Sequence, residues 1–180
     1  MLRLTRNPAM VAVSLCACLW AETSGIWLDV PFVRQEKDGC GSASIAMVMQ
    51  YWLRQQGRAA DERADAVHIQ RELYAAGARG IYASDLERYL QAQGFRTFAF
   101  PGRWTDLRQH LKKGRPLIVA LKPGGGAPLH YVVVAGLDWE HDLVMVNDPA
   151  ERKLLKQERA EFERRWQSAG SWMLLAVPGG

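Results

Sequence analysis

Hydrophobic residues are spaced differently in the two halves of this chain. From Cys40 to Gln56 they cover most of a helical circumference, and Gly57 follows them. Such a pattern predicts a long helix that runs through the core and ends at a glycine. Ahead of it, Ile26 to Val33 alternates loosely around Pro31, which is typical of an extended edge segment.

Three shorter segments between residues 58 and 114 also have helical patterns, and glycines close the last two at Gly94 and Gly114. The first is Ala66–Ala76, in which Val67, Leu73 and Tyr74 are expected to face inward. The second begins at the capping box Ser84–Glu87, and its buried residues are expected to be Leu86, Tyr89 and Leu90. The third is Asp106–Lys113, with Thr105 as its cap. The first half of the chain is therefore expected to be mainly helical.

The second half carries apolar runs of strand length that are separated by turn residues. The expected strands are Phe95–Phe100, Pro116–Leu121, His130–Leu137, Leu143–Val146 and Trp172–Val177, with a charged helix near Glu158–Gln167. Strands that lie close together in sequence commonly pair antiparallel. We therefore expect a single α+β domain whose N-terminal helices pack on a mostly antiparallel C-terminal sheet, with the active surface between them.

The first 21 residues have a different character. A basic start, Met1 to Arg6, precedes an apolar stretch, Pro8 to Trp20, which has the length of a signal-peptide core and is too short for a stable membrane anchor. We expect residues 1–21 to be a signal peptide and residues 22–180 to be the folded domain. The domain is then exported to the periplasm, the cell envelope or the medium.

Processing of this leader has three alternatives. Leu15–Cys18 resembles a bacterial lipobox, which would leave Cys18 lipidated and tether the protein to a membrane. Leu19–Ala21 is a looser match to a small-residue cleavage site, and an uncleaved helix packed on the domain is the third alternative.

The charge of the chain does not point to nucleic acid. The net charge is +4 at pH 7, and Arg3 and Arg6 of the leader supply two of these charges. No stripe of Lys and Arg is interleaved with aromatic residues, so a nucleic-acid partner is not expected.

Cys40 is the candidate for chemistry, because the other two cysteines, Cys16 and Cys18, lie in the leader. It has no partner for an intrachain disulfide, and it begins the long helix, where unpaired N–H groups stabilise a thiolate. His130 opens one expected strand and Asp148 closes the next. A hairpin that turns around residues 139–142 would bring these two side chains together, although a shift of one residue in its register would change which side chains share a face.

Single residues of this kind more often have structural roles. A buried thiol alone is most simply a small hydrophobic group, and Asp148 before Pro149 is compatible with a simple turn. Asn147 is an alternative partner for the histidine. Zinc binding by Cys40, His130 and Asp148 matches no known zinc spacing.

Several motifs in the expected order add a family resemblance. They are Asp29–Phe32, Gln35–Ser44, His130–Gly136 and Asn147–Pro149. Together they resemble the bacteriocin-processing cysteine peptidases that cleave double-glycine leaders and have a papain-like fold. The resemblance implies that Cys40 is the nucleophile, His130 the general base and acid, Asp148 the carboxylate that orients it, and Gln35 a donor to the oxyanion.

The chain also differs from the best-known members of that family. Ser42 stands where many members have proline, and those members are fused to an ABC transporter at the cytoplasmic face. The expected export makes stand-alone relatives the nearer comparison, and leaves open both cleavage of double-glycine leaders and association with a separate export system. The implied function is hydrolysis of a peptide or protein through a Cys40 acyl-enzyme, without a cofactor. Acyl transfer by the same site and an inactive peptidase fold used as a binding module are the alternatives.

The remaining histidines and the glycine run have simpler interpretations. His68, His110 and His141 are expected to be structural or solvated. Gly124–Gly126 lacks the Lys-Ser/Thr of a phosphate-binding loop, and we expect it to be a mobile connection beside the cleft.

Overall fold

The structure, a computed structural model, describes residues 24–124 and 127–179. The expected signal peptide, Cys18 and residues 125–126 of the glycine run lie outside the described residues. The strands are β1 Gly25–Trp27, β2 Phe95–Pro101, β3 Leu117–Leu121, β4 His130–Asp138, β5 Leu143–Asn147, β6 Leu155–Glu158 and β7 Trp172–Pro178. The helices are α1 Cys40–Gln55, α2 Ala66–Leu73, α3 Ala83–Ala92, α4 Trp104–Lys112 and α5 Arg159–Gln167, with a short 3₁₀ turn at Glu62–Ala64.

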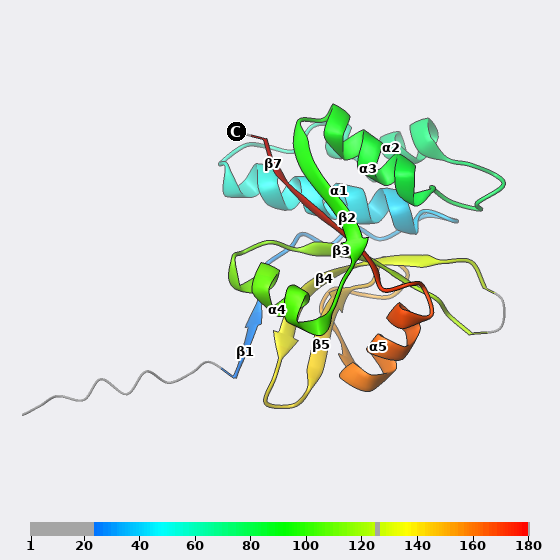
Figure 1. Cartoon of the computed structure of the whole chain (residues 1–180). Helices are drawn as coiled ribbons and strands as arrows, with labels where there is room; N and C mark the ends of the chain where they lie inside the picture. Colours follow the sequence, from blue (N-terminus) through cyan, green and yellow to red (C-terminus); the bar gives the residue numbers. More distant parts are fainter. Residues whose placement is uncertain (1–23, 125–126, 180) are drawn as a thin grey trace, which may run out of the picture.

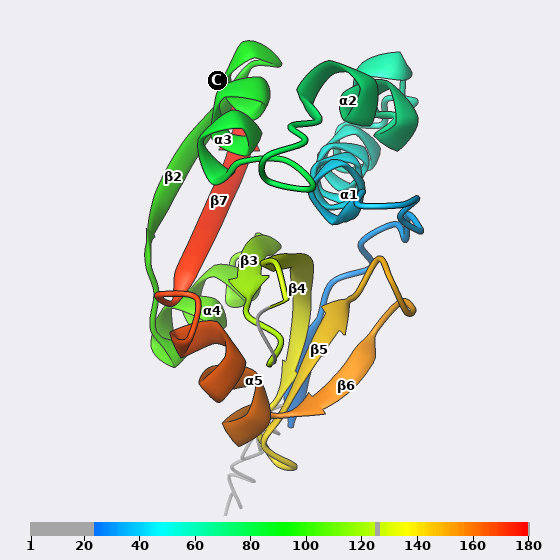
Figure 2. The same cartoon turned by 90° about the vertical axis from the view of Figure 1, so that its right-hand side faces the viewer.

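The strands form one sheet in which each pairing is antiparallel. Their order is β2-β7-β3-β4-β5-β6, and β1 pairs with β4. Helices α1, α2 and α3 pack on one face of the sheet, and α4 and α5 pack on the opposite face (Figures 1 and 2). The predicted α+β architecture, with N-terminal helices on an antiparallel sheet, is confirmed.

The sheet is buried on both faces, which explains the unbroken apolar runs of its central strands. Successive residues of a strand point to opposite faces. In β4, Val133 and Ala135 pack in the core that holds α1, α2 and α3, whereas Val132 and Val134 pack in the second core with α4 and α5.

The predicted inward face of α2 is wrong for two residues. Val67 and Tyr74 are 39% and 45% exposed, whereas Ile69 is fully buried. Residues two apart on a helix do not share a face, so burial of Ile69 turns Val67 outward. The helix ends at Leu73, and Tyr74 already has extended backbone angles.

Two predicted helix caps are also wrong. Helix α3 begins at Ala83, so Ser84 lies inside its first turn and Tyr82 is the N-cap, without a side-chain hydrogen bond. Helix α4 begins at Trp104, before Thr105, and the Asp106 carboxylate accepts a hydrogen bond from the Arg103 backbone N–H at 2.9 Å. In both helices a carboxylate in the first turn complements the helix dipole.

Within the described part of the chain, no helix combines the length and the apolar character needed to cross a membrane.

Candidate active site

Cys40 is the first residue of α1, and β4 begins at the same side of the molecule (Figure 1). The side chain of Cys40 is half-buried, and Gly39 precedes it as the N-cap. Ser42 steadies this turn, because its hydroxyl lies 3.0 Å from the Gly39 carbonyl oxygen and 2.9 Å from Gln70 Oε1. Ser42 therefore links the start of α1 to α2.

His130 and Asp148 come from neighbouring strands of the predicted hairpin. His130 is the first residue of β4, and Asp148 directly follows β5. His130 Nε2 lies 2.7 Å from Asp148 Oδ1, and the two side chains are only 16% and 5% exposed. Cys40 also acts on this ring, because its hydrogen bonding and its negative charge are among the causes that raise the pKa of His130. The structure thus brings Cys40, His130 and Asp148 into one connected row.

An irregularity in β4 puts the histidine and the aspartate on one face. Near the hairpin turn Gly136 pairs with Met145, but the register shifts so that Val134 pairs with Val146 and Val133 with Asn147. Relative to the register at the hairpin turn, the extra residue at this β-bulge moves the preceding side chains of β4, from Val134 back to His130, by one position against β5. Without the bulge, the side chains of His130 and Asp148 would point to opposite faces.

Burial and charge together set the ionisation of this row. Burial alone lowers the pKa of His130, but the hydrogen bonds and negative charges of Asp148 and Cys40 outweigh it and raise that pKa to about 9. For Asp148, burial favours the neutral acid, yet the hydrogen bond and charge of His130 outweigh it and lower the pKa of the carboxyl. The site therefore holds an imidazolium between two acidic groups at neutral pH.

Gln35 lies in the loop ahead of α1 and is tied to the Asp148 segment. Its backbone N–H donates to the Pro149 carbonyl oxygen at 2.9 Å. Its side-chain Oε1 is buried and has no hydrogen-bond partner among the described residues. The oxygen of this amide, in the loop that leads to Cys40, is therefore not used by the described fold.

Asn147 does not take the place of Asp148 beside the histidine. Its amide is fully buried and donates to the Val30 carbonyl at 3.1 Å and to the Pro31 carbonyl at 3.4 Å, while its oxygen accepts from the Leu154 N–H at 2.9 Å. Both ends of the side chain hold loops against β5. The alternative that Asn147 orients His130 is therefore excluded.

We expect Asn147→Ala to destabilise the fold by about 2–4 kcal/mol, because it leaves buried backbone groups without partners. Urea unfolding followed by circular dichroism measures this loss. Gln167→Ala, which removes an exposed amide at the end of α5, serves as the matched control. Equal midpoints for the two variants would contradict the structural role of Asn147.

The other histidines lie away from this row. His68 lies 3.7 Å from Glu72, and His141 Nδ1 lies 2.9 Å from Asp138 Oδ2. His110 is partly buried in α4, and burial lowers its pKa. Over residues 24–124 and 127–179, no group of three or more His, Cys, Asp or Glu side chains has an arrangement that could hold a metal ion.

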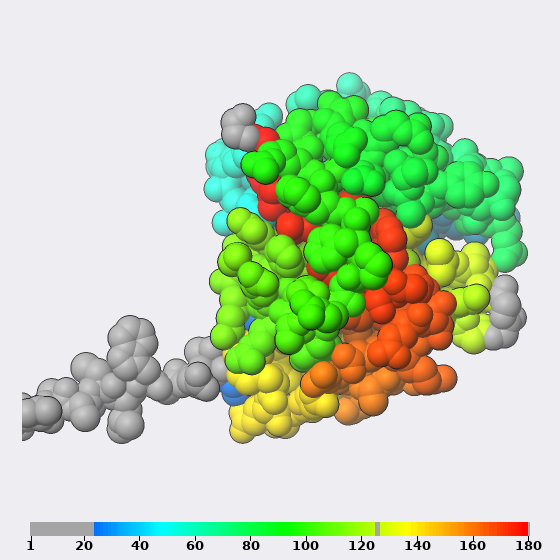
Figure 3. All heavy atoms as spheres, viewed as in Figure 1, coloured from blue at the N-terminus to red at the C-terminus, as the bar shows by residue number. Residues whose placement is uncertain are grey.

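A hollow of about 370 Å³ opens beside the sulfur, and its walls were not predicted from the sequence. Its lining is Cys40, Ala78, Arg79, Gly80, Ile81, Tyr82, Ala83, Pro128, Leu129 and Tyr131. In Figure 3 the surface is notched on this side, between the green atoms near α2 and the yellow atoms that lead to β4. Apolar residues in connecting segments give no periodic signal, so their position at a cleft is visible only in the fold.

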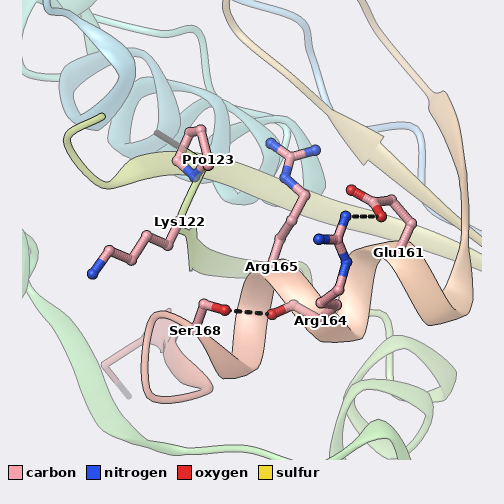
Figure 4. A pocket seen from close by; sticks show the side chains of 7 residues that line it. Lys122, Pro123, Glu161, Arg164, Arg165 and Ser168 are labelled. Atoms are coloured by element: carbon pink, nitrogen blue, oxygen red, sulfur yellow. Dashed lines mark hydrogen bonds and ion pairs between the residues drawn. The ribbon is translucent and has the colours of Figure 1, made fainter. Parts of the chain in front are cut away.

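A second hollow, of about 700 Å³, lies at the end of β3 beside α5. Figure 4 shows that Lys122, Arg164 and Arg165 line it, that Arg164 pairs with Glu161, and that the Ser168 hydroxyl donates to the Arg164 carbonyl. Neither the cysteine nor the histidine lines this hollow. Its one hydroxyl caps the end of α5, so the chemistry belongs to the row at Cys40.

Comparison with known proteins gives one family. A sequence model described as Peptidase_C39 like family matches residues 27–173. A search of curated proteins gives no match.

Solved structures share the fold of this chain. A C39-like peptidase from Bacillus anthracis is 20% identical with a TM-score of 0.66, and the match covers 85% of this chain and 97% of that one. The peptidase domain of Streptococcus ComA, a bi-functional ABC transporter involved in a quorum sensing pathway, is 19% identical with a TM-score of 0.63 and coverage of 82% and 97%. A double glycine motif protease from an AMS/PCAT transporter, solved in complex with the leader peptide, is 22% identical with a TM-score of 0.62 and coverage of 84% and 94%. These matches confirm the predicted papain-like peptidase fold.

Proposed function

Because this chain belongs to the Peptidase_C39 like family, a family of cysteine peptidases, we propose that it hydrolyses peptide bonds with Cys40 as its nucleophile. The observation that carries this proposal is the row at the start of α1, in which His130 lies 2.7 Å from Asp148 and Cys40 helps to raise the pKa of the same imidazole. A nucleophile, a base and a group that orients the base are the parts that covalent acyl transfer requires. Cys40, His130 and Asp148 supply them in that order.

The first half of the proposed reaction forms an acyl-enzyme. The Cys40 thiolate attacks the peptide carbonyl carbon, and the oxygen becomes an oxyanion that accepts hydrogen bonds from the Gln35 amide and the Cys40 backbone N–H. The intermediate collapses when the His130 imidazolium gives its proton to the leaving amine. The products are a thioester on Cys40 and the free amine of the departing peptide.

The second half returns the enzyme to its starting state. Neutral His130 takes a proton from water, and the resulting hydroxide adds to the thioester carbon. The carboxylic acid leaves and Cys40 becomes a thiolate again, with the imidazolium beside it. Asp148 keeps the imidazole ring in position through both halves.

The substrate class and the place of action are part of the same proposal. A peptide substrate is supported by the relative that is described as a double glycine motif protease in complex with the leader peptide. Action outside the cytoplasm is supported by the signal-peptide pattern of residues 1–21. Whether this chain accepts paired glycines depends on the shape of the hollow beside Cys40.

Product analysis tests the proposal, and Gln35 supplies its sharpest variant. We expect wild type to convert peptides into an acid and an amine, and Gln35→Ala to lower kcat about 100-fold because one oxyanion donor is lost. Mass spectrometry of the products and progress curves measure both. Gln50→Ala is the matched control. It removes an amide in the second half of α1, which donates a hydrogen bond to the Ala64 carbonyl oxygen.

Two results would count against the proposal. An amide formed with an added amine, in place of the free acid, would identify a transferase. Unchanged kcat in Gln35→Ala would remove this side chain from the oxyanion site.

A further inference from the structure

The hollow beside Cys40 is apolar, preformed and open to solvent at its rim. Its floor includes Ile81 and Tyr131, which are 4% and 5% exposed. Its rim carries Tyr82 and Leu129, which are 51% and 45% exposed. Large apolar side chains exposed on two facing segments, at a cavity that contains the nucleophile, are a binding feature and not a fold requirement.

Packing fixes the floor in place. Ile81 lies against the first turn of α1, so closely that a methyl group on Gly41 would come within 3.1 Å of the Ile81 Cβ. The Tyr131 ring packs edge-on against Trp172, with ring centroids 5.6 Å apart. Burial, with the negative charge of Cys40, raises the pKa of Tyr131 to about 12, so its phenol stays neutral. The floor of the pocket, formed by Ile81 and Tyr131, is therefore uncharged.

The walls come from two segments of the chain that are far apart in the sequence. Leu129 directly precedes His130, and Tyr82 directly precedes α3. Paired backbone hydrogen bonds between Ala75 and Gly80 hold the loop that leads to Ile81, and Arg79 is the charged residue of the lining. A substrate side chain that enters the pocket would therefore contact Leu129, the residue directly before the general base His130.

The volume of the hollow decides what fits. About 370 Å³ is many times the ~30 Å³ that one water occupies in the liquid. Glycine has no side chain to place there, so a pair of glycines would leave apolar walls in contact with water. A leucine or phenylalanine would cover Tyr82 and Leu129 and bury apolar surface of its own.

We propose that this pocket binds a large apolar side chain of the substrate residue that lies next to the scissile bond, and that the chain discriminates against paired glycines at that place. This assignment of substrate class rests on the proposed peptidase function. It differs from the specificity in the description of the double glycine motif relative.

Equilibrium binding to Cys40→Ala tests the pocket without requiring catalysis. The probes are fluorescein-labelled decapeptides with a central Gly-Gly pair, and the same peptides with leucine at each of the four central positions in turn. We expect at least one leucine peptide to bind about tenfold more tightly than the Gly-Gly peptide by fluorescence anisotropy. That advantage should fall to about twofold or less in Leu129→Ala and Tyr82→Ala, and persist in Phe98→Ala, an exposed aromatic on β2 outside the pocket.

The outcomes separate this inference from the proposed function. Equal or tighter binding of the Gly-Gly peptide, or a leucine advantage that survives in both wall variants, overturns the pocket assignment. If the leucine preference is present but wild type leaves the same peptide intact, the pocket stands and the peptidase function fails. If wild type cleaves Gly-Gly and leucine peptides equally well, the function stands and the pocket assignment fails.

Discussion

Replacing Cys40 with alanine should abolish peptide hydrolysis, with a loss of at least about 1000-fold in kcat/KM, while the fold remains intact. In the proposed mechanism the sulfur forms the only covalent bond to the substrate, and no second thiol lies among the described residues. Alanine is a good helix former, so the first turn of α1 can accept it. Chromatography of peptide products measures the activity, and thermal unfolding by circular dichroism measures the fold.

Cys40→Ser is the informative companion variant. Its hydroxyl keeps nearly the shape of the thiol and can still bond to His130, but it is a far weaker nucleophile at neutral pH. We expect the same loss of activity as in Cys40→Ala. Turnover at the wild-type rate in either variant would show that the reaction does not pass through Cys40.

The long-range pattern of this sequence was enough to predict the fold class. The apolar run of α1 predicted a buried helix between Cys40 and Gly57, and the runs at β3, β4, β5 and β7 predicted the strands. Helix ends were harder, because Ser84 and Thr105 have the chemistry of N-caps but lie inside their helices. Tertiary packing placed those ends one residue or more away from the local signals.

Strand β6 shows why weakly apolar elements were missed. Residues Leu155–Glu158 carry one large apolar side chain among polar ones, so the segment has no strand-like run. It becomes a strand because the edge of β5 offers it unpaired backbone groups. That information lies in the partner strand and not in the segment itself.

The candidate site was predictable as a set of residues but not as a geometry. His130 starts β4 and Asp148 follows the end of β5. Because successive strands commonly pair antiparallel, the sequence predicted that these two residues would be neighbours. Whether they shared a face depended on the bulge between Val134 and Gly136, where a glycine and a small alanine leave no distinctive pattern. The pocket walls at Tyr82 and Leu129 were invisible to the sequence for a similar reason, since exposure is a property of the assembled fold.

Ionisation of His130 is the second prediction with a large effect. With a pKa raised to about 9, the ring stays protonated at neutral pH and can supply the proton that the leaving amine needs. Hydrolysis should therefore fall as the pH rises through about 9. Asp148→Asn removes one of the two negative partners, so this alkaline limb should move toward lower pH by one unit or more.

The same shift links ionisation to stability. The pKa of His130 in the folded chain lies above the unfolded value of about 6.5. The imidazolium therefore stabilises the fold fully below about pH 6.5, and this contribution is lost as the pH rises through about 9. Urea midpoints measured across that window should decline in wild type and be flatter in Asp148→Asn.

The most direct measurement of the central claim is an NMR titration of the His130 imidazole nitrogens in the intact domain, assigned by comparison with His130→Ala. We expect an imidazolium that persists through neutral pH and titrates near 9, with a lower midpoint in Cys40→Ala and in Asp148→Asn. A ring that titrates at or below 6.5 in wild type, and does not respond to either substitution, would show that the cysteine and the aspartate do not hold the histidine charged between them.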